Sequence, residues 1–451
     1  MSPALDSIFK AYDIRGTVPD QLDAELCRRI GAAFARFAES DRLLIAHDMR
    51  PSGPELAGAF AEGATGQGVD VVDLGLASTD LMYFAAGHLD APGAMFTASH
   101  NPAQYNGIKL CLAGAKPVGQ DTGLAKVKEW AAEGLEPLGG RPGAMSHQDL
   151  LGVYADHVRS FVDRGLLAPR HIVADTANGM GGLVAPAVFE GLPFTVEYLF
   201  PELDGTFPNH PPDPIQRENL RDLQQAIRER GADVGLAFDG DADRVFLVDQ
   251  DANPISGSLT TALVATGMLA KHPGATILYN LICSKAVPEI IAQHGGTPVR
   301  TRVGHSFIKQ TMAETGAVFG GEHSGHYYFR DNYRADSGLV AALVVLEQLS
   351  VAGGTLSELV APLDRYANSG EINAPVDDPV ATIDRVAEAY ADADQDRLDG
   401  LTVDAGSWWF NLRPSNTEPL LRLNLEAPTA EECEARTAEV VELIREVGGE
   451  G

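Results

Sequence analysis

The sequence has little of the positive charge that binding to a polyanion requires. Its 451 residues carry 34 lysines and arginines against 63 aspartates and glutamates, a formal net charge of −29 at pH 7. Because nucleic acid and other dense polyphosphates are bound by basic surfaces, nucleic acid is disfavoured as a partner. A small phosphorylated ligand is still compatible with this charge, since a few local cations or helix N-termini inside a cleft outweigh the overall field.

Cysteines and long apolar runs are also scarce. The first ten residues have no basic stretch followed by an apolar core, and the strongest apolar run, residues 339–346, ends at Glu347. The cysteines form no CxxC pair, which argues against a zinc cluster or a disulfide framework. They are Cys27, Cys111, Cys283 and Cys433. We therefore expect a cytoplasmic protein with reduced thiols, no membrane span and no membrane partner.

The chain has enough apolar residues to form several hydrophobic cores. Hydrophobic residues make up 45% and charged residues 22% of the chain, which is close to the average for globular proteins. At roughly 150 residues per domain, two to four domains are expected.

Strand-length apolar runs alternate with helix-period segments, a pattern typical of α/β domains with parallel sheets. Residues 43–46 and 69–74 are predicted strands, with a predicted helix at 54–66 between them. Further strands are predicted at residues 171–174, 231–238, 276–280 and 407–412, and further helical segments at 379–399 and 430–447. Breaks are predicted at residues 134–146, 249–254 and 368–378.

The first loop that carries chemistry is residues 97–102 (TASHNP), directly after the apolar residues 94–96. A hydroxyl just past a strand end lies where α/β sheets place ligands, so Ser99 is a candidate nucleophile. Taken alone, the same residues also suit an ordinary turn.

The second loop is residues 239–244 (DGDADR). Three alternating carboxylates repel one another unless a hard cation draws them together, which indicates Mg²⁺ or Ca²⁺. An EF-hand needs Gly at position six and Glu at position twelve, but Arg244 and Gln250 stand there, so that calcium motif is excluded. The alternative, a solvated acidic turn, fits less well because apolar strands are predicted on both sides.

Two later loops are rich in hydrogen-bonding groups. Residues 320–326 (GGEHSGH) combine polar side chains with glycines, which suits a polyol such as a sugar. Residues 413–419 (RPSNTEP) offer a guanidinium, hydroxyls and backbone N–H groups for a phosphate, and Arg422 adds a second charge. Either loop alone could be a plain turn.

Taken together, in this order and at these separations, the four loops resemble the active-site loops of the α-D-phosphohexomutase family. The resemblance runs from residues 9–16 (FKAYDIRG) to residues 413–417 (RPSNT). It implies a heart-shaped α/β architecture of four domains, three α/β domains with mixed or parallel sheets and a C-terminal α+β domain. With the breaks above, we expect a phosphoserine domain at 1–145, a metal domain at 146–248, a sugar domain at 249–367 and a phosphate-binding domain at 368–451.

The resemblance also implies a role for each matching residue. Ser99 would carry the phosphoryl group, and Ser99, Asp239, Asp241 and Asp243 would hold one Mg²⁺. Lys109 and His326 would be the general acid and base, in an order left open, with Arg15 beside the reacting oxygens. The implied substrate-binding residues are Tyr12, Arg15, His100, Arg244, Gly304, His305, Glu322, Ser324, His326, Arg413, Ser415, Asn416, Thr417 and Arg422.

The implied reaction is an intramolecular phosphoryl transfer between C6 and C1 of a hexose, through phosphoserine and a hexose 1,6-bisphosphate that also serves as activator. Positioning and charge cancellation matter most in such a transfer, and the four loops are equipped for both. The sugar loop, followed by Tyr327-Tyr328-Phe329, looks closest to bacterial phosphomannomutases. As the substrate we therefore expect mannose phosphates first, both mannose and glucose phosphates second, and glucosamine phosphates third.

Two other classes of protein share some of these features. A Mg²⁺-dependent sugar phosphatase would use the aspartate loop but has no need for a second phosphate site. A non-catalytic sugar-phosphate binding protein would have no need for Ser99 beside three aspartates. The oligomeric state is left open by the sequence.

Overall fold

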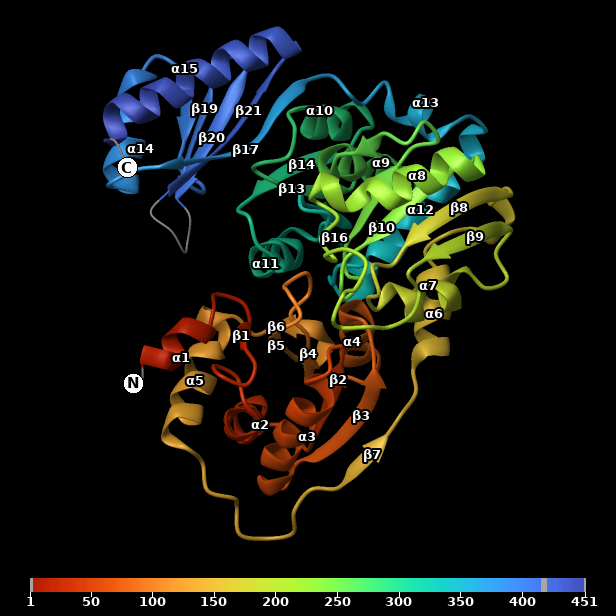
Figure 1. Ribbon diagram of the computed structural model, residues 1–451, viewed down its shortest axis with the longest axis vertical. Helices are drawn as coiled ribbons and strands as arrows, with labels where there is room; N and C mark the ends of the chain where they lie inside the picture. Colours follow the sequence, from red (N-terminus) through yellow and green to blue (C-terminus); the bar gives the residue numbers. More distant parts are fainter. Residues whose placement is uncertain (1–2, 415–419, 450–451) are drawn as a thin grey trace.

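Four β-sheets follow one another along the chain, each built from its own stretch of sequence. The computed structural model of the protein describes residues 3–414 and 420–449. Figure 1 shows the N-terminal stretch in red and orange at the bottom, the middle of the chain in yellow to teal above it, and the C-terminal stretch in blue at the upper left.

The first sheet is mixed, with strand order β1-β5-β4-β2-β3-β7 and β6 beside β5. Its strands β4, β2, β3 and β7 are parallel, whereas β5 runs antiparallel to both β4 and β1. The strands are β1 (Ile14–Thr17), β2 (Arg42–His47), β3 (Asp70–Leu76), β4 (Gly93–Phe96), β5 (Tyr105–Leu112), β6 (Lys116–Pro117) and β7 (Met145–His147). The strands predicted at 43–46 and 69–74 are confirmed as β2 and β3.

The second and third sheets are also mixed, with orders β12-β11-β10-β8-β9 and β14-β13-β15-β16. The second contains β8 (Arg170–Asp175), β9 (Phe194–Leu199), β10 (Val234–Phe238), β11 (Val245–Val248) and β12 (Pro254–Ile255). The third contains β13 (Thr276–Asn280), β14 (Thr297–Thr301), β15 (Phe319–Gly321) and β16 (Tyr327–Phe329).

The fourth sheet is antiparallel throughout, in the order β17-β21-β20-β19-β18. Its strands are β17 (Ala367–Pro375), β18 (Asp394–Asp396), β19 (Leu401–Asp404), β20 (Trp409–Pro414) and β21 (Leu420–Ala427). Three mixed α/β sheets and a C-terminal antiparallel sheet with helices confirm the predicted fold class.

Strand β17 begins at residue 367 and pairs with β21, so the fourth sheet starts at the predicted break of 368–378. One local prediction in this last part was wrong. The helix expected over residues 379–399 ends at Ala389, and residues 394–396 form β18 against β19. Pairing with a neighbouring strand overrides the local helical pattern there.

The helices begin and end at ordinary capping signals. Ser78, Ser256, Ser337 and Thr429, for example, each accept a hydrogen bond from a first-turn backbone N–H of the helix they precede. The helices are α1 (Pro3–Ile8), α2 (Ala24–Ala38), α3 (Gly53–Gly66), α4 (Thr79–His88), α5 (Leu124–Glu133), α6 (Leu151–Arg159), α7 (Gly181–Phe189), α8 (Arg221–Arg230), α9 (Gly257–Lys271), α10 (Ala286–Gln293), α11 (His305–Thr315), α12 (Gly338–Ala352), α13 (Leu356–Val360), α14 (Pro379–Ala389) and α15 (Ala430–Gly448). Among the described residues, none of these helices has the length and apolar character needed to cross a bilayer.

The cores show how the parts are joined. One large cluster of buried side chains extends from α4 through the second and third sheets, including Phe84, Phe238 and Phe329. The fourth sheet has a separate core with its two helices, α14 and α15. The first three parts are therefore packed on one another through shared apolar side chains, which holds their loops in a fixed relation.

The predicted domain boundaries fall close to changes of sheet. Strand β7 at 145–147 pairs with β3 of the first sheet, and β12 at 254–255 pairs with β11 of the second. Both extend slightly past the predicted ends at 145 and 248, so the boundaries stay a prediction.

Candidate active site

The predicted nucleophile lies at the end of a buried strand. Strand β4 ends at Phe96, and Ser99 follows with only 5% of its surface exposed. Its backbone has a positive φ of 49°, and its N–H donates to Thr97 Oγ1 at 2.9 Å. A non-glycine residue in this conformation is held there by its surroundings, and such residues cluster at functional sites.

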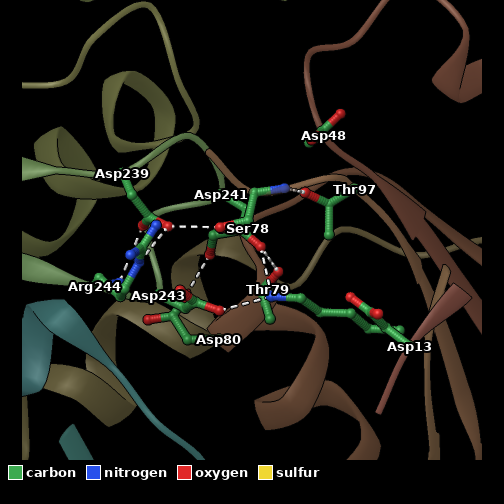
Figure 2. A network of polar contacts seen from close by, with 12 residues as sticks. Asp13, Asp48, Ser78, Thr79, Asp80, Thr97, Asp239, Asp241, Asp243 and Arg244 are labelled. Carbon is green, nitrogen blue, oxygen red and sulfur yellow. Dashed lines mark hydrogen bonds and ion pairs between the residues drawn. The ribbon is translucent and has the colours of Figure 1, made fainter. Parts of the chain in front are cut away.

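The acidic loop joins β10 to β11 and faces Ser99 from another part of the chain. The hydroxyl of Ser99 donates to Asp239 Oδ2 at 2.8 Å. Asp239, Asp241 and Asp243 are each at most 1% exposed, and one oxygen from each lies within 4.8 Å of the others. Figure 2 shows the three carboxylates converging, with Arg244 against Asp239. The structure thus brings together the residues predicted to bind the metal.

Two cations partly neutralise these carboxylates. Lys109 on β5 donates from Nζ to Asp241 Oδ2 and to Asp243 Oδ2, both at 2.8 Å. Arg244 Nε donates to Asp239 Oδ2 at 2.9 Å. Burial opposes the charged ammonium, but Asp241 and Asp243 raise the pKa of Lys109 well above its usual value. Burial likewise opposes ionisation of Asp241, yet Lys109 holds the pKa of that carboxyl below its usual value.

The residues present fit a divalent cation. Asp241 Oδ1 and Asp243 Oδ1 are buried and have no hydrogen-bond donor within the described chain. Buried carboxylate oxygens without a partner are costly, and a bound cation would satisfy them. Three carboxylates against two cationic side chains leave one negative charge, and an all-oxygen donor set suits Mg²⁺. This is an acidic metal-binding site that fits magnesium.

His326 reaches the same centre from the third sheet. It follows the turn between β15 and β16 and contacts Asp336 Oδ2 through Nδ1 at 2.7 Å, with Asp243 Oδ1 at 3.8 Å. Burial alone would lower the pKa of His326, but Asp243 and Asp336 raise it to about 8. Because a carboxylate can only accept, Nδ1 carries a proton and Nε2 is left to exchange one with a ligand.

Two further predicted residues touch the serine loop. Arg15 donates from Nη1 to Asn101 Oδ1 at 2.5 Å and from Nη2 to Asp13 Oδ2. His100 Nδ1 lies 3.2 Å from Ser99 Oγ and 2.7 Å from Arg244 Nη2. Burial and the charge of Arg244 lower the pKa of His100 to about 2, so this ring is a neutral acceptor.

The predicted sugar-binding residues form an adjoining group. Glu322, 3% exposed, accepts hydrogen bonds from Tyr328 Oη at 2.6 Å and Gly304 N at 3.4 Å. Ser324 lies half-buried in the following turn. The ring centroids of Tyr12 and His305 are 5.0 Å apart, which joins the N-terminal signature to this group.

The C-terminal arginines lie on paired strands, opposite each other on β20 and β21. Arg413 Nη2 and Arg422 Nη1 both contact the carboxylate of Glu371, at 3.0 and 3.5 Å. No described contact joins these arginines directly to Ser99 or the aspartates. The predicted phosphate-loop residues Ser415, Asn416 and Thr417 lie outside the described residues.

Several residues that hold the predicted ones in place belong to none of the sequence motifs. Thr79 Oγ1 donates to Asp241 Oδ2 at 2.5 Å, and Asp336 holds His326. Both lie outside the motifs: Thr79 is the first residue of α4, and Asp336, ten residues after His326, precedes α12. An acidic or hydroxyl residue beside a helix start is common, so no local pattern marks them out.

Comparisons with known proteins agree with this geometry. Four domain models described as phosphoglucomutase/phosphomannomutase match the chain: α/β/α domain I at residues 6–135, domain II at 153–253, domain III at 256–366 and the C-terminal domain at 371–443. A curated protein of Xanthomonas campestris named "Phosphohexose mutases" is 41% identical over 442 residues, covering 97% of this chain and 99% of the relative. A phosphomannomutase of Salmonella montevideo is 39% identical over 448 residues, covering 97% and 98%.

A solved structure is similar over the full length. It is a phosphoglucomutase/phosphomannomutase family protein from Burkholderia thailandensis, with a TM-score of 0.89, 32% identity, and coverage of 99% of this chain and 98% of that one. The chain therefore belongs to the phosphoglucomutase/phosphomannomutase family and is a phosphohexomutase, an isomerase that transfers phosphate within its substrate.

Proposed function

We propose that this phosphohexomutase interconverts mannose 6-phosphate and mannose 1-phosphate and that Ser99 carries the phosphoryl group between turnovers. The observation that carries the proposal is the hydroxyl of Ser99 at 2.8 Å from Asp239 Oδ2, inside a group of three buried aspartates supplied by another sheet. A serine aimed into a cation site is equipped to hold a phosphoryl group against positive charge.

Asp239, Asp241, Asp243 and an oxygen on Ser99 would hold Mg²⁺. When bound, Mg²⁺ supplies positive charge that offsets the negative charge of the transferring phosphoryl group. The chain adds cations of its own, since Lys109 and Arg244 both contact these carboxylates. Arg15, fixed to Asn101 in the serine loop, would bind the same phosphoryl oxygens.

The reaction consists of two transfers in opposite directions. Phosphoserine 99 donates to the free hydroxyl of a hexose 6-phosphate, so the bond between Ser99 Oγ and phosphorus breaks as the bond to the sugar oxygen forms. The product is a hexose 1,6-bisphosphate, which turns around in the site. Its other phosphate then returns to Ser99, which regenerates phosphoserine and releases the 1-phosphate. A bisphosphate that escapes leaves Ser99 unphosphorylated, so added bisphosphate would act as an activator.

His326 is the better candidate for moving the proton. Its Nδ1 is occupied by Asp336, so Nε2 would take the proton of the attacking hydroxyl and return one in the reverse transfer. Lys109 is held protonated between two carboxylates, which suits charge stabilisation more than proton abstraction. We therefore assign proton transfer to His326 and charge stabilisation to Lys109.

The remaining predicted residues would hold the sugar and its other phosphate. Glu322 and Ser324 would bind sugar hydroxyls, with Tyr12, Gly304 and His305 beside them. Arg413 and Arg422 would bind the distal phosphate in place of Glu371, together with Ser415, Asn416 and Thr417. Two arginines that already share one carboxylate can grip a phosphate bidentately.

We also propose the four-domain division at 1–145, 146–248, 249–367 and 368–451, and a cytoplasmic location in which hexose phosphates are available. The division is supported by the succession of four sheets and by the four family matches, although β12 and the end of the second match lie just beyond residue 248. A dual mannose and glucose specificity is the second candidate, since the family name joins both activities. We assign glucosamine phosphates as the third choice.

The experiment that tests the proposal measures kcat/KM for mannose, glucose and glucosamine 1-phosphates, each with the matching bisphosphate and Mg²⁺. We expect the highest value with mannose 1-phosphate and a lag without bisphosphate. Release of free phosphate without isomerisation would instead indicate a phosphatase. Higher kcat/KM for glucose or glucosamine phosphate would refute the mannose assignment.

A further inference from the structure

A fully buried arginine lies directly beneath the serine loop. Arg50, in the turn between β2 and α3, has a side-chain exposure of 0%. Its guanidinium donates to four backbone carbonyls of residues 99–105: Ser99 O at 2.9 Å, Asn101 O at 2.6 Å, and Pro102 O and Tyr105 O, both at 2.9 Å. An arginine whose two terminal nitrogens both donate hydrogen bonds to one loop fixes the backbone path of that loop.

The guanidinium is itself held from two sides. Arg50 Nε lies 3.3 Å from Asp48 Oδ2. The other oxygen of the same carboxylate, Asp48 Oδ1, accepts a hydrogen bond from Arg50 N at 2.9 Å. The ring of Phe207, from the second part of the chain, lies with its centroid 5.2 Å from Arg50 Cζ. A Cβ on Gly205 would come within 2.5 Å of Arg50 Cα, so the two segments are in close backbone contact. Arg50 therefore joins the serine loop to the segment that follows β9, in the same part of the chain as the aspartates.

The carbonyl of Ser99 has no room to move on its other side. A Cβ on Gly240, in the acidic loop, would lie 2.4 Å from Ser99 O, which shows how closely the two loops pass. Ser99 also has a positive φ of 49°. If its carbonyl rotated away from Arg50, the peptide would turn relative to Gly240 and carry Ser99 Oγ away from Asp239.

We propose that Arg50 is a positioning residue for phosphoryl transfer, which holds Ser99 in its left-handed conformation and in register with the acidic loop. This inference rests on the proposed role of Ser99. Arg50 contacts Ser99 only at its backbone carbonyl, and no described hydrogen bond or ion pair joins Arg50 to Asp239, Asp241 or Asp243, so it acts through the backbone of the serine loop. Its loss should lower turnover and leave sugar binding largely intact.

The test uses Arg50→Lys in the full chain. Lysine keeps the buried positive charge beside Asp48, but its single ammonium cannot reach all four carbonyls. A misplacement of about 1 Å costs up to about 100-fold in rate, so we expect kcat to fall about 10- to 100-fold while KM for mannose 1-phosphate changes less than about threefold. Single-turnover transfer from phosphoserine 99 to the sugar should slow by the same factor. Backbone amides of residues 99–101 and 103–106 should exchange hydrogen faster than in the parent.

Arg170→Lys is the matched control. Arg170 Nη2 also donates to two carbonyls, Leu349 O at 3.2 Å and Gly354 O at 3.1 Å, but far along the chain from the catalytic loops. This variant should lose some thermal stability and keep the parent kcat. A comparable fall in kcat in both variants would overturn the inference, because it would show a general effect of losing a guanidinium that binds backbone carbonyls.

The parent is analysed first for phosphate on Ser99. If active parent carries none, the proposed function fails and this inference fails with it. If the parent is phosphorylated and folded Arg50→Lys turns over like the parent, only the role of Arg50 is refuted. Should Arg50→Lys not fold, Phe207→Leu decides: it removes the ring beneath the guanidinium and keeps the hydrogen bonds, so kcat should fall about two- to fivefold. Unchanged kcat in Phe207→Leu would then refute the inference.

Discussion

Replacing Asp336 by asparagine tests the state of His326 directly. In the parent, Asp336 Oδ2 accepts from His326 Nδ1 at 2.7 Å, and the carboxylate adds a negative charge beside the ring. Asparagine keeps the shape but not the charge, and its amide group can face the ring as a donor. The substitution therefore removes much of what stabilises the imidazolium, while Asp243 at 3.8 Å stays in place.

The size of the effect follows from the pKa of His326. Asp243 and Asp336 overcome burial and raise that pKa to about 8 from 6.5. A rise of this size corresponds to about 2 kcal/mol of folding free energy, present below pH 6.5 and lost as the pH rises through 8. With one of the two carboxylates gone, we expect the pKa of His326 to fall by about 1 to 2 units. If the asparagine amide donates to Nδ1, the proton of the neutral ring moves to Nε2. Nε2 can then no longer accept a proton from the substrate, and kcat should fall about 100-fold.

The assay is a titration of the His326 ring by NMR in metal-free protein, with the signal assigned by its loss in His326→Gln. The parent should titrate near pH 8. Asp336→Asn should titrate clearly lower, and the parent itself should shift down when Mg²⁺ neutralises Asp243. An unchanged His326 titration in Asp336→Asn, or unchanged kcat, would refute the assignment of Asp336 as the residue that orients this histidine.

Three further predictions concern other parts of the molecule. Asp241→Asn should raise the Mg²⁺ concentration for half-maximal activity by about tenfold, because one of three negative ligands is lost; full activity in chelator-treated enzyme would contradict it. Arg413→Ala should lower kcat, raise KM and increase the dependence on added hexose 1,6-bisphosphate, because binding of the remote phosphate aligns the reacting hydroxyl. If all three parameters are unchanged, the loop that follows Arg413 does not bind phosphate. Tyr154→Phe removes the buried hydroxyl that donates to Asp80, a carboxylate that Ser337 Oγ also contacts at 2.8 Å. We expect the free energy of unfolding in urea to fall by about 1 kcal/mol. An unchanged unfolding midpoint would show that the hydrogen bond from Tyr154 does not stabilise the protein.

Local patterns predicted most of the strands that carry the loops. The apolar run at residues 276–280 coincides with β13, and the loops at 97–102 and 239–244 follow β4 and β10 as expected. These elements are predictable because a buried parallel strand has a short apolar sequence ending in turn-forming residues. The helix at 379–399 was overestimated because β18 forms through pairing with β19, which local sequence does not report.

The supporting contacts could not be predicted in the same way. Arg50 acts through four backbone carbonyls, and a carbonyl looks the same whatever the residue type. Asp80, Tyr154 and Ser337 meet across three parts of the chain, so their meeting depends on how those parts pack. Sequence motifs identify groups that touch a ligand, whereas the residues holding those groups in place are determined by tertiary structure.

The phosphorylation state of Ser99 tests the central claim most directly. Mass analysis of a digest of freshly purified, active protein should find phosphate on the peptide that contains Ser99. That phosphate should disappear on brief exposure to excess mannose 6-phosphate, as bisphosphate forms, and return on incubation with hexose 1,6-bisphosphate. Ser99→Ala should lose both the phosphate and nearly all turnover. An active enzyme that never carries phosphate on Ser99, with an alanine variant that keeps near-parent turnover, would contradict the account.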